Sequence, residues 1–458
     1  MTDFQQLSLA PALLQGLERL GYTQTTPIQN AALPAILSGR DLIARAPTGS
    51  GKTAAFGLGL LQRLDPAQRT VQALVLCPTR ELAGQVAQTI RRLASGLPNV
   101  TLLSLCGGSS LAPQTTALQH GAHIVVGTPG RIQKHLQKGS LDLGALRTLV
   151  LDEADRMLDM GFIDAIAAIA EQAPAARQTL LFSATYPEAI ARLSARFQRE
   201  PLEVFTASPA DRPAIEQHCF ETTEDERGGA LLRLLAHYQP ERALIFCNTK
   251  RRCDEVAALL NGHGHRALAQ HGDLEQRERN DVLVQFANHS INLLVASDVA
   301  ARGLDIDDLP VVINYELSPD PQVHTHRIGR TGRAGRRGLA LSLFTAAEAH
   351  RLAAIETLAG SPCQRAALDS LAPSGDEPPR AAMTTLQIGG GRKDKLRPGD
   401  ILGALTREGG IDGGQIGKID IFDRHSCVAV AHKVADNAQR QLAAGRIKGR
   451  KFKVRRLA

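Results

Sequence analysis

Residues 46–53 spell APTGSGKT, and this octapeptide narrows the kinds of fold that the chain can adopt. It follows the apolar run DLIARA at 41–46 and opens a helical pattern at 54–64. Glycines at a strand-to-helix turn let backbone N–H groups wrap phosphates, while a Lys reaches the β- and γ-phosphates and a Thr hydroxyl ligates Mg²⁺. The octapeptide predicts a phosphate-binding loop at the end of a strand, although Ala46 replaces the usual first Gly.

Short apolar runs recur along the chain, each followed by a polar turn and a helical pattern. They occupy 41–46, 73–78, 123–129, 149–154 and 179–185 in the first half, and 243–249, 292–298, 311–317 and 339–344 in the second. Continuous apolar strands that alternate with helices indicate a parallel sheet covered on both faces. We therefore predict two tandem α/β domains.

Two segments rich in Pro, Ser and Asp divide the chain, TASPADRP at 206–213 and APSGDEPPR at 372–380. Such composition is typical of linkers. The predicted domains span 1–205, 214–365 and 382–458, and the predicted linkers span 206–213 and 366–381. The last domain has the pattern β-α-β-β-α-β, which predicts a small ferredoxin-like fold.

Positive charge is concentrated in the last predicted domain. Residues 382–458 hold 16 Lys and Arg against 7 Asp and Glu, a net charge of +9, whereas the rest of the chain has a net charge of −2. A merely solvated surface is the alternative, but this distribution favours a module that binds a polyanion.

Several protein classes are disfavoured by the sequence. No apolar run reaches the ~18 residues of a membrane span, and the N-terminus lacks the pattern of a secretory signal, so we expect a cytoplasmic protein. The seven cysteines are far apart and form no CxxC pair. We therefore expect neither a zinc site nor a disulfide framework.

A second motif, VLDEAD at 150–155, ends an apolar run with carboxylates about 100 residues after the phosphate-binding loop. In this position Asp152 would hold Mg²⁺, and Glu153 would orient and deprotonate the attacking water. A solvated helix start is the alternative for an acidic tetrad in isolation.

These two motifs and six others occur in the order and spacing that are typical of one protein family. The others are GYTQTTPIQ (21–29), PTRELA (78–83), TPGR (128–131), SAT (183–185), ARGLDI (301–306) and HRIGRTGR (326–333). Over residues 1–360 the chain resembles the DEAD-box ATP-dependent RNA helicases, which have two RecA-like domains. With its basic C-terminal domain it resembles, more narrowly, the bacterial DbpA subfamily, whose RRM-like tail recognises a hairpin of large-subunit ribosomal RNA.

The resemblance implies an ATP site built from several motifs. Gln29 and Tyr22 would contact adenine, with Phe4 beside them, although either aromatic could instead be a core residue. Asp305 would contact the ribose. The catalytic residues would be Lys52, Asp152 and Glu153, together with Arg330 and Arg333 as arginine fingers. Ser183 and Thr185 would couple Asp152 and Glu153 to domain closure. The full nucleotide-contacting set is Phe4, Tyr22, Gln29, Ala46, Thr48, Gly49, Ser50, Gly51, Lys52, Thr53 and Asp305, with Thr53 and Asp152 on Mg²⁺.

The resemblance also implies RNA contacts to phosphates and 2′-hydroxyls. The matching positions in the helicase domains are Arg80, Glu81, Gly107, Gly108, Thr128, Arg131, Thr249, Gln276, Arg279 and Arg302. In the tail, the three stacking positions of an RRM are Gln387, His425 and Cys427, so base stacking on that sheet is doubtful. We place the tail contacts on the basic residues Arg446, Lys448, Arg450, Lys451 and Lys453.

The sequence therefore predicts an RNA-dependent ATPase that separates short RNA helices, with ATP and Mg²⁺ as cofactors. Its expected partners are a 23S ribosomal RNA hairpin and precursors of the large ribosomal subunit, and we expect a monomer without membrane contact. A non-catalytic ATP-gated RNA clamp is disfavoured by Glu153, Arg330 and Arg333. A translocating DNA helicase is disfavoured by the DEAD and GYTQTTPIQ motifs.

Overall fold

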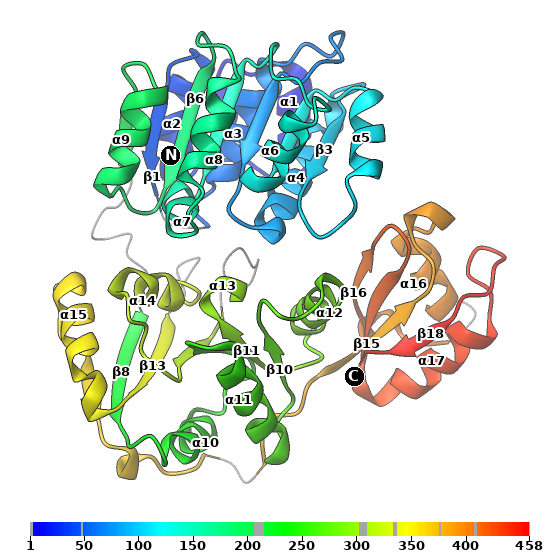
Figure 1. The fold of residues 1–458 in the computed structure, drawn as a ribbon. Coiled ribbons are helices and arrows are strands. Elements are labelled where there is room, and N and C mark those ends of the chain that lie inside the picture. Colours follow the sequence, from blue (N-terminus) through cyan, green and yellow to red (C-terminus); the bar gives the residue numbers. More distant parts are fainter. Residues whose placement is uncertain are drawn as a thin grey trace. The chain divides into compact units, whose positions relative to one another are not determined.

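The computed structural model describes residues 3–46, 49–205, 215–301, 309–332, 337–374, 377–406 and 410–457. It divides into two compact units, Met1–Arg212 and Pro213–Ala458, which we describe separately (Figure 1). None of the helices within these ranges is long and apolar enough to cross a membrane.

The first unit is a parallel seven-stranded sheet with helices on both faces (Figure 1). Its strand order is β3-β4-β2-β5-β6-β1-β7. The strands are β1 (Leu42–Arg45), β2 (Ala73–Leu76), β3 (Leu102–Leu105), β4 (Ile124–Gly127), β5 (Thr148–Asp152), β6 (Gln178–Ser183) and β7 (Leu202–Phe205). The helices are η1 (Phe4–Gln6), α1 (Pro11–Arg19), α2 (Pro27–Leu37), α3 (Lys52–Gln62), α4 (Arg80–Leu93), η2 (Ala94–Gly96), α5 (Ala112–Gln119), α6 (Pro129–Gln137), α7 (Ala154–Asp159), α8 (Ile163–Glu171) and α9 (Glu188–Phe197).

Alternating side chains of each central strand enter two different cores. In β1, Leu42 and Ala44 join the core on one face, whereas Ile43 joins the core on the other. Because successive strand residues point to opposite faces, a strand that is buried on both sides must be apolar throughout. This explains why the central strands are continuous apolar runs in the sequence.

The second unit begins with another parallel seven-stranded sheet, in the order β10-β11-β9-β12-β13-β8-β14. Its strands are β8 (Ile215–Glu221), β9 (Ala243–Cys247), β10 (Ala267–Gln270), β11 (Leu293–Ser297), β12 (Val311–Asn314), β13 (Gly338–Phe344) and β14 (Gln364–Ala366). The helices are α10 (Arg227–Tyr238), α11 (Lys250–Gly262), α12 (Gln276–Ala287), α13 (Asp298–Ala301), α14 (Pro321–Ile328), η4 (Ala346–Glu348), α15 (Ala349–Ala359) and η5 (Leu368–Ser370).

The second unit also contains a four-stranded antiparallel sheet in the order β16-β17-β15-β18. Its elements are β15 (Met383–Ile388), η6 (Arg392–Asp394), α16 (Pro398–Thr406), η7 (Gly413–Gln415), β16 (Ile416–Ile421), β17 (Ser426–Ala431), η8 (His432–Val434), α17 (Ala435–Ala444) and β18 (Val454–Arg456). The order β-α-β-β-α-β confirms the predicted ferredoxin-like fold, and the two parallel sheets confirm the predicted tandem α/β architecture.

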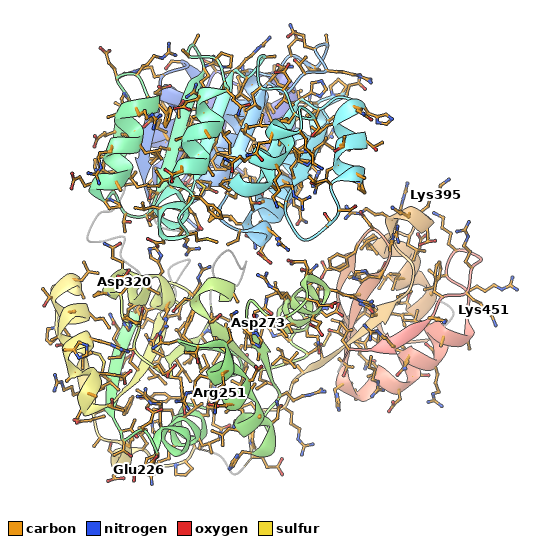
Figure 2. The ribbon with its side chains drawn as sticks, viewed as in Figure 1. Glu226, Arg251, Asp273, Asp320, Lys395 and Lys451 are labelled. Carbon is orange, nitrogen blue, oxygen red and sulfur yellow. A yellow bond between two sulfur atoms is a disulfide. The ribbon has the colours of Figure 1, made fainter. Side chains whose placement is uncertain are left out.

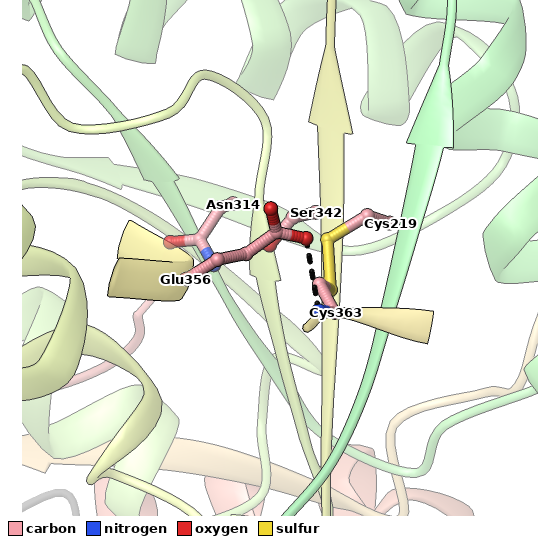
Figure 3. Close-up of a disulfide and its surroundings, with 5 residues drawn as sticks. All are labelled: Cys219, Asn314, Ser342, Glu356 and Cys363. Atoms are coloured by element: carbon pink, nitrogen blue, oxygen red, sulfur yellow. Dashed lines mark hydrogen bonds between the residues drawn. A yellow bond between two sulfur atoms is a disulfide. The ribbon is translucent and has the colours of Figure 1, made fainter. Parts of the chain in front are cut away.

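One prediction about the cysteines is wrong, because Cys219 and Cys363 form a disulfide (Figure 3). Cys219 lies in β8 and Cys363 directly precedes β14, and their Cα atoms are 6.2 Å apart. The backbone N–H of Cys363 donates to Glu356 Oε1 at 3.0 Å. The two cysteines are 144 residues apart, and only the pairing of β14 beside β8 brings them together.

Candidate functional site

The phosphate-binding loop is placed as predicted, between β1 and the first residue of α3, Lys52. Gly49 and Gly51 have φ angles of 82° and 97°, which L side chains rarely adopt. A Cβ atom on Gly51 would also lie 2.5 Å from Gln29 Nε2. Lys52 is buried, and its Nζ donates to Ala46 O at 3.0 Å. Thr48 lies outside the described residues, whereas Ser50 and Thr53 are partly exposed.

Gln29 fastens α2 to this loop. Its Oε1 accepts from Thr26 N at 2.9 Å, and its Nε2 donates to Gly51 O at 3.1 Å. Thr26 Oγ1 donates to Ser50 O at 2.8 Å. The predicted adenine-contacting segment therefore also holds the phosphate-binding loop, a role for Thr26 that the sequence analysis missed.

The two aromatic candidates near this segment differ in exposure. Phe4 is 2% exposed and belongs to the core, where its ring meets the edge of Tyr22 at 6.3 Å between centroids. This favours the packing alternative for Phe4. Tyr22 is only partly buried, so its ring can present an open face to a ligand.

Asp152 and Glu153 lie at the end of β5, and both are buried. Burial raises the pKa of Asp152 to about 7, against the opposing charge of Lys52. Asp152 Oδ1 is buried and has no hydrogen-bond partner among the residues that the structure describes. A buried carboxylate oxygen without a partner costs folding free energy unless a ligand binds it. Because Mg²⁺ prefers oxygen ligands, Asp152 fits the predicted ion.

Glu153 has a φ of 53°, a left-handed conformation that is uncommon for a residue other than glycine. Its Oε2 accepts from Arg156 Nη1 at 2.8 Å in a buried ion pair. Strained backbone is concentrated at functional sites, where the surrounding structure holds it. Arg156, which the sequence analysis missed, fixes the orientation of this carboxylate.

Ser183 and Thr185, which we expect to couple Asp152 and Glu153 to domain closure, contact a third carboxylate, that of Asp155. Asp155 Oδ2 accepts from Thr185 N at 2.8 Å and from Thr185 Oγ1 at 3.0 Å, and Ser183 Oγ accepts from Asp155 N at 3.2 Å. The last carboxylate of the tetrad therefore ties the end of β5 to the end of β6.

The arginines of HRIGRTGR have different environments. Arg327 is 1% exposed and donates to Asp298 Oδ1 at 2.6 Å, Glu316 O at 2.6 Å and Asn248 Oδ1 at 2.8 Å. Arg327 therefore links three separate segments of the second unit. Arg330 is also buried and follows Gly329, the C-cap residue of α14. Arg333, with Arg302 and Asp305, lies outside the described residues.

The six predicted RNA contacts of the first unit gather beside the ends of β3 and β4. The guanidinium of Arg80 lies against Gly107 and Gly108, where a Cβ atom on Gly108 would be 1.9 Å from Arg80 Nη1. Thr128 directly precedes α6, and Arg131 lies in its first turn. Glu81 follows Arg80 in the first turn of α4. Gln114, which was not predicted, bonds to Arg131.

The predicted contacts of the second unit lie at helix starts. Thr249 is exposed and precedes α11, where its Oγ1 accepts from Arg252 N at 3.2 Å. Gln276 and Arg279 lie in the first turn of α12, and both are partly exposed. A nearby ion pair joins Lys250 to Asp273; Figure 2 labels Asp273.

The sheet face of the ferredoxin-like domain is partly covered within the second unit. Gln387 Nε2 donates to Asp281 Oδ1 in α12 at 3.2 Å, and Arg455 Nη2 approaches Asp281 Oδ2 at 3.5 Å. Thr385 Oγ1 lies 2.6 Å from Ser290 Oγ. Cys427 is fully buried. Two of the three RRM stacking positions are thus taken up by packing, which explains their lack of aromatic side chains.

The basic residues of this domain remain accessible. Arg446, Lys448, Arg450, Lys451 and Lys453 are all exposed, and Figure 2 shows Lys451 at the surface. Within the described residues, no group of three or more His, Cys, Asp or Glu side chains could hold a metal ion. The exposed Lys and Arg side chains are suited to phosphates because of their positive charge.

Three known protein families match this chain. DEAD/DEAH box helicase matches residues 26–193, Helicase conserved C-terminal domain matches 226–335, and DbpA RNA binding domain matches 385–456. The class defined by the fold and the site is therefore a helicase with an RNA-binding domain.

Similar proteins agree with this class. The ATP-dependent RNA helicase DbpA of Escherichia coli K12 is 53% identical over 464 residues, which cover all of both chains. The helicase CshA of Geobacillus kaustophilus is 46% identical over 78% of this chain and 76% of its own. Dbp5 of S. cerevisiae, solved with RNA and ADP BeF3, has a TM-score of 0.74 at 31% identity, over 81% of this chain and 97% of its own. This chain belongs to the DEAD-box ATP-dependent RNA helicases.

Proposed function

We propose that this RNA helicase remodels 23S ribosomal RNA in cytoplasmic precursors of the large ribosomal subunit, as a monomer, and that its C-terminal domain directs it there. The net charge of +9 in residues 382–458 carries the proposal, because exposed Lys and Arg bind phosphates with release of counterions. With Gln387 and Cys427 occupied by packing, the surface that remains suits a folded hairpin better than stacked single bases.

Hydrolysis would take place in the first unit. Lys52 would neutralise phosphate charge, Thr53 and Asp152 would hold Mg²⁺, and Glu153 would orient and deprotonate water. The ion would supply further neutralisation of the phosphates. The orphaned Oδ1 of Asp152 supports this assignment.

Arginines of the second unit would complete the reaction. Arg330 and Arg333 would stabilise the charge that develops during phosphoryl transfer, and Asp305 would contact the ribose. Domain closure would also bring the RNA-contacting residues of both units onto one strand and bend it. Asp155 supports the coupling of these events, because its contacts with Ser183 and Thr185 join two strand ends beside the nucleotide.

The test compares two matched triple variants of the full chain. One removes Arg446, Lys451 and Lys453, and the control removes the equally exposed Lys393, Lys433 and Arg440 of the same domain by the same change to Ala. RNA-stimulated ATPase activity is titrated with a 23S rRNA hairpin and with poly-A at two salt concentrations.

The first triple variant should need about 10-fold more hairpin for half-saturation and show a lower salt slope, with little change for poly-A. Equal effects of both triple variants on both RNAs would reject a targeting role. In that case the tail would be a general electrostatic anchor.

A further inference from the structure

Gln114 occupies a central position in a polar network of the first unit that the family motifs do not include. It lies in α5 and is partly buried. Its Nε2 donates to Cys106 O at 3.1 Å, which is the carbonyl directly before Gly107 and Gly108. The side chain is therefore anchored to the loop that packs against Arg80.

The other end of the same amide holds Arg131. Gln114 Oε1 accepts from Arg131 Nη1 at 2.8 Å, and Arg131 Nη2 donates to Ser109 O at 2.8 Å. These bonds use one N–H of each terminal nitrogen, and a guanidinium has a second N–H on each. Arg131 is thus oriented on one edge while donors remain for a phosphate.

Arg131 and Cys106 O fix which way the amide of Gln114 points, and the amide in turn sets the tautomer of His135. Its ring is fully buried, and Nε2 lies 3.0 Å from Gln114 Oε1 while Nδ1 lies 2.8 Å from Ser140 Oγ. Since Oε1 can only accept, His135 Nε2 must carry a proton. A flipped amide would set its NH2 group against the donor Arg131 Nη1 and its oxygen against the acceptor Cys106 O, so the orientation with Nε2 on Cys106 O is enforced. Burial, with the charges of Arg131 and Lys138, lowers the pKa of His135 and favours its neutral form.

We propose that Gln114 is a positioning residue for RNA binding, which locks Arg131 and the Gly107–Gly108 loop into one geometry before RNA arrives. The inference rests on the proposed RNA contact of Arg131. A long side chain that is already ordered loses less conformational entropy on binding than a free one. Preorganisation of this kind raises RNA affinity without a contact between Gln114 and RNA.

The experiment uses the full chain and an unstructured RNA that stimulates ATP hydrolysis. The variants are Gln114→Met, Arg131→Ala and their combination. Gln119→Ala is the control, because Gln119 is an exposed glutamine of the same helix. Gln114→Glu is a second probe that keeps an acceptor for Arg131 and His135 but loses the donor to Cys106 O. The RNA concentration for half-saturation, kcat at saturating RNA, KM for ATP and the unfolding temperature are measured for each.

Gln114→Met should raise the half-saturating RNA concentration about 5- to 30-fold, the equivalent of one or two hydrogen bonds. The kcat and the KM for ATP should stay within about twofold, and Gln114→Glu should lie between Gln114→Met and the native chain. Because Gln114 acts through Arg131, the combined variant should be no worse than Arg131→Ala alone.

Three results would overturn the inference. Effects of Gln114→Met and Arg131→Ala that multiply would show that the residues act independently. A lower unfolding temperature with a raised KM for ATP would show a general structural role. An Arg131→Ala variant with native RNA affinity would remove the proposed contact itself, and this outcome is distinct from a failure of Gln114 alone.

Discussion

The two parallel sheets share one topology but differ at the turn that follows their equivalent strands. Counted from the start of each sheet, both have the strand order 3-4-2-5-6-1-7. After β1 come Gly49, Gly51 and Lys52, whereas after β8 come Glu224, Asp225 and Glu226. The first turn attracts phosphates and the second repels them. A repeated fold therefore does not imply a repeated site.

The ends of the central strands differ in the same way. Asp152 at the end of β5 keeps an unpartnered oxygen, whereas Asn314 at the end of β12 donates to Ser342 Oγ at 3.0 Å. A cavity of about 810 Å³ does open at the end of β8, beside the disulfide. Its lining holds four acidic side chains (Glu221, Asp225, Glu226 and Asp369) against two basic ones (Arg233 and Arg365), a balance that disfavours phosphates.

We expect the greatest effect from a change of Glu153, which follows β5 in the first unit. The control changes an acidic residue of the turn after β8 in the second unit. Glu153→Gln should lose about 10²- to 10⁴-fold in RNA-stimulated ATP hydrolysis, the range for removal of a general base, with ATP and RNA binding retained. Glu226→Gln, in the acidic turn of the second unit, is the control and should retain native turnover. Near-normal hydrolysis by Glu153→Gln would refute the role of this residue.

The second effect concerns the disulfide. Among the described residues, a disulfide is present in the second unit and not in the first. Replacing both Cys219 and Cys363 with Ala should lower the free energy of unfolding of this unit by about 2–5 kcal/mol. Denaturant unfolding with and without a reductant measures it. The reductant should destabilise the native chain and leave the variant unchanged; a native chain indifferent to reductant would contradict the prediction.

A smaller effect is expected where Gln29 fastens the phosphate-binding loop. Gln29→Ala removes two hydrogen bonds and should raise the KM for ATP about 10-fold, equivalent to about 1.4 kcal/mol. Gln24→Ala, an exposed residue of the same segment, is the control. Equal KM values for Gln29→Ala and Gln24→Ala would show that the two hydrogen bonds of Gln29 do not contribute to ATP binding.

The smallest effect is a pH dependence in the second unit. Burial, reinforced by Arg327, lowers the pKa of His324 from 6.5 to about 4. Below pH 6.5 the unfolded chain therefore binds a proton that the folded chain does not, so stability falls as the pH falls. Between pH 7.5 and 5.5 the loss from this group is about 1.3 kcal/mol. Urea unfolding of His324→Gln should show a loss smaller by that amount, and an equal pH dependence would contradict the assignment.

The sequence predicted the central strands well because these are buried on both faces. It missed β3, β7, β8, β10 and β14, none of which is buried along its whole length. A strand with one exposed face lacks a continuous apolar run, so its pattern is weak.

The motif residues of the candidate site were also predictable, since phosphate chemistry restricts residue types and spacing. Their supporting partners were not. Arg156 and Gln114 act through contacts that only the folded chain brings together, and 17 residues separate Gln114 from Arg131. The disulfide likewise depends on the pairing of two strands that were not predicted.

We propose that the chain has one ATP site, in the first unit, although its two parallel sheets have the same topology. Equilibrium dialysis of the full chain with a non-hydrolysable ATP analogue and Mg²⁺ should give one bound nucleotide per chain. Lys52→Ala should abolish this binding, and Glu226→Gln should leave it unchanged. Two nucleotides per chain, or binding that survives Lys52→Ala, would contradict the account.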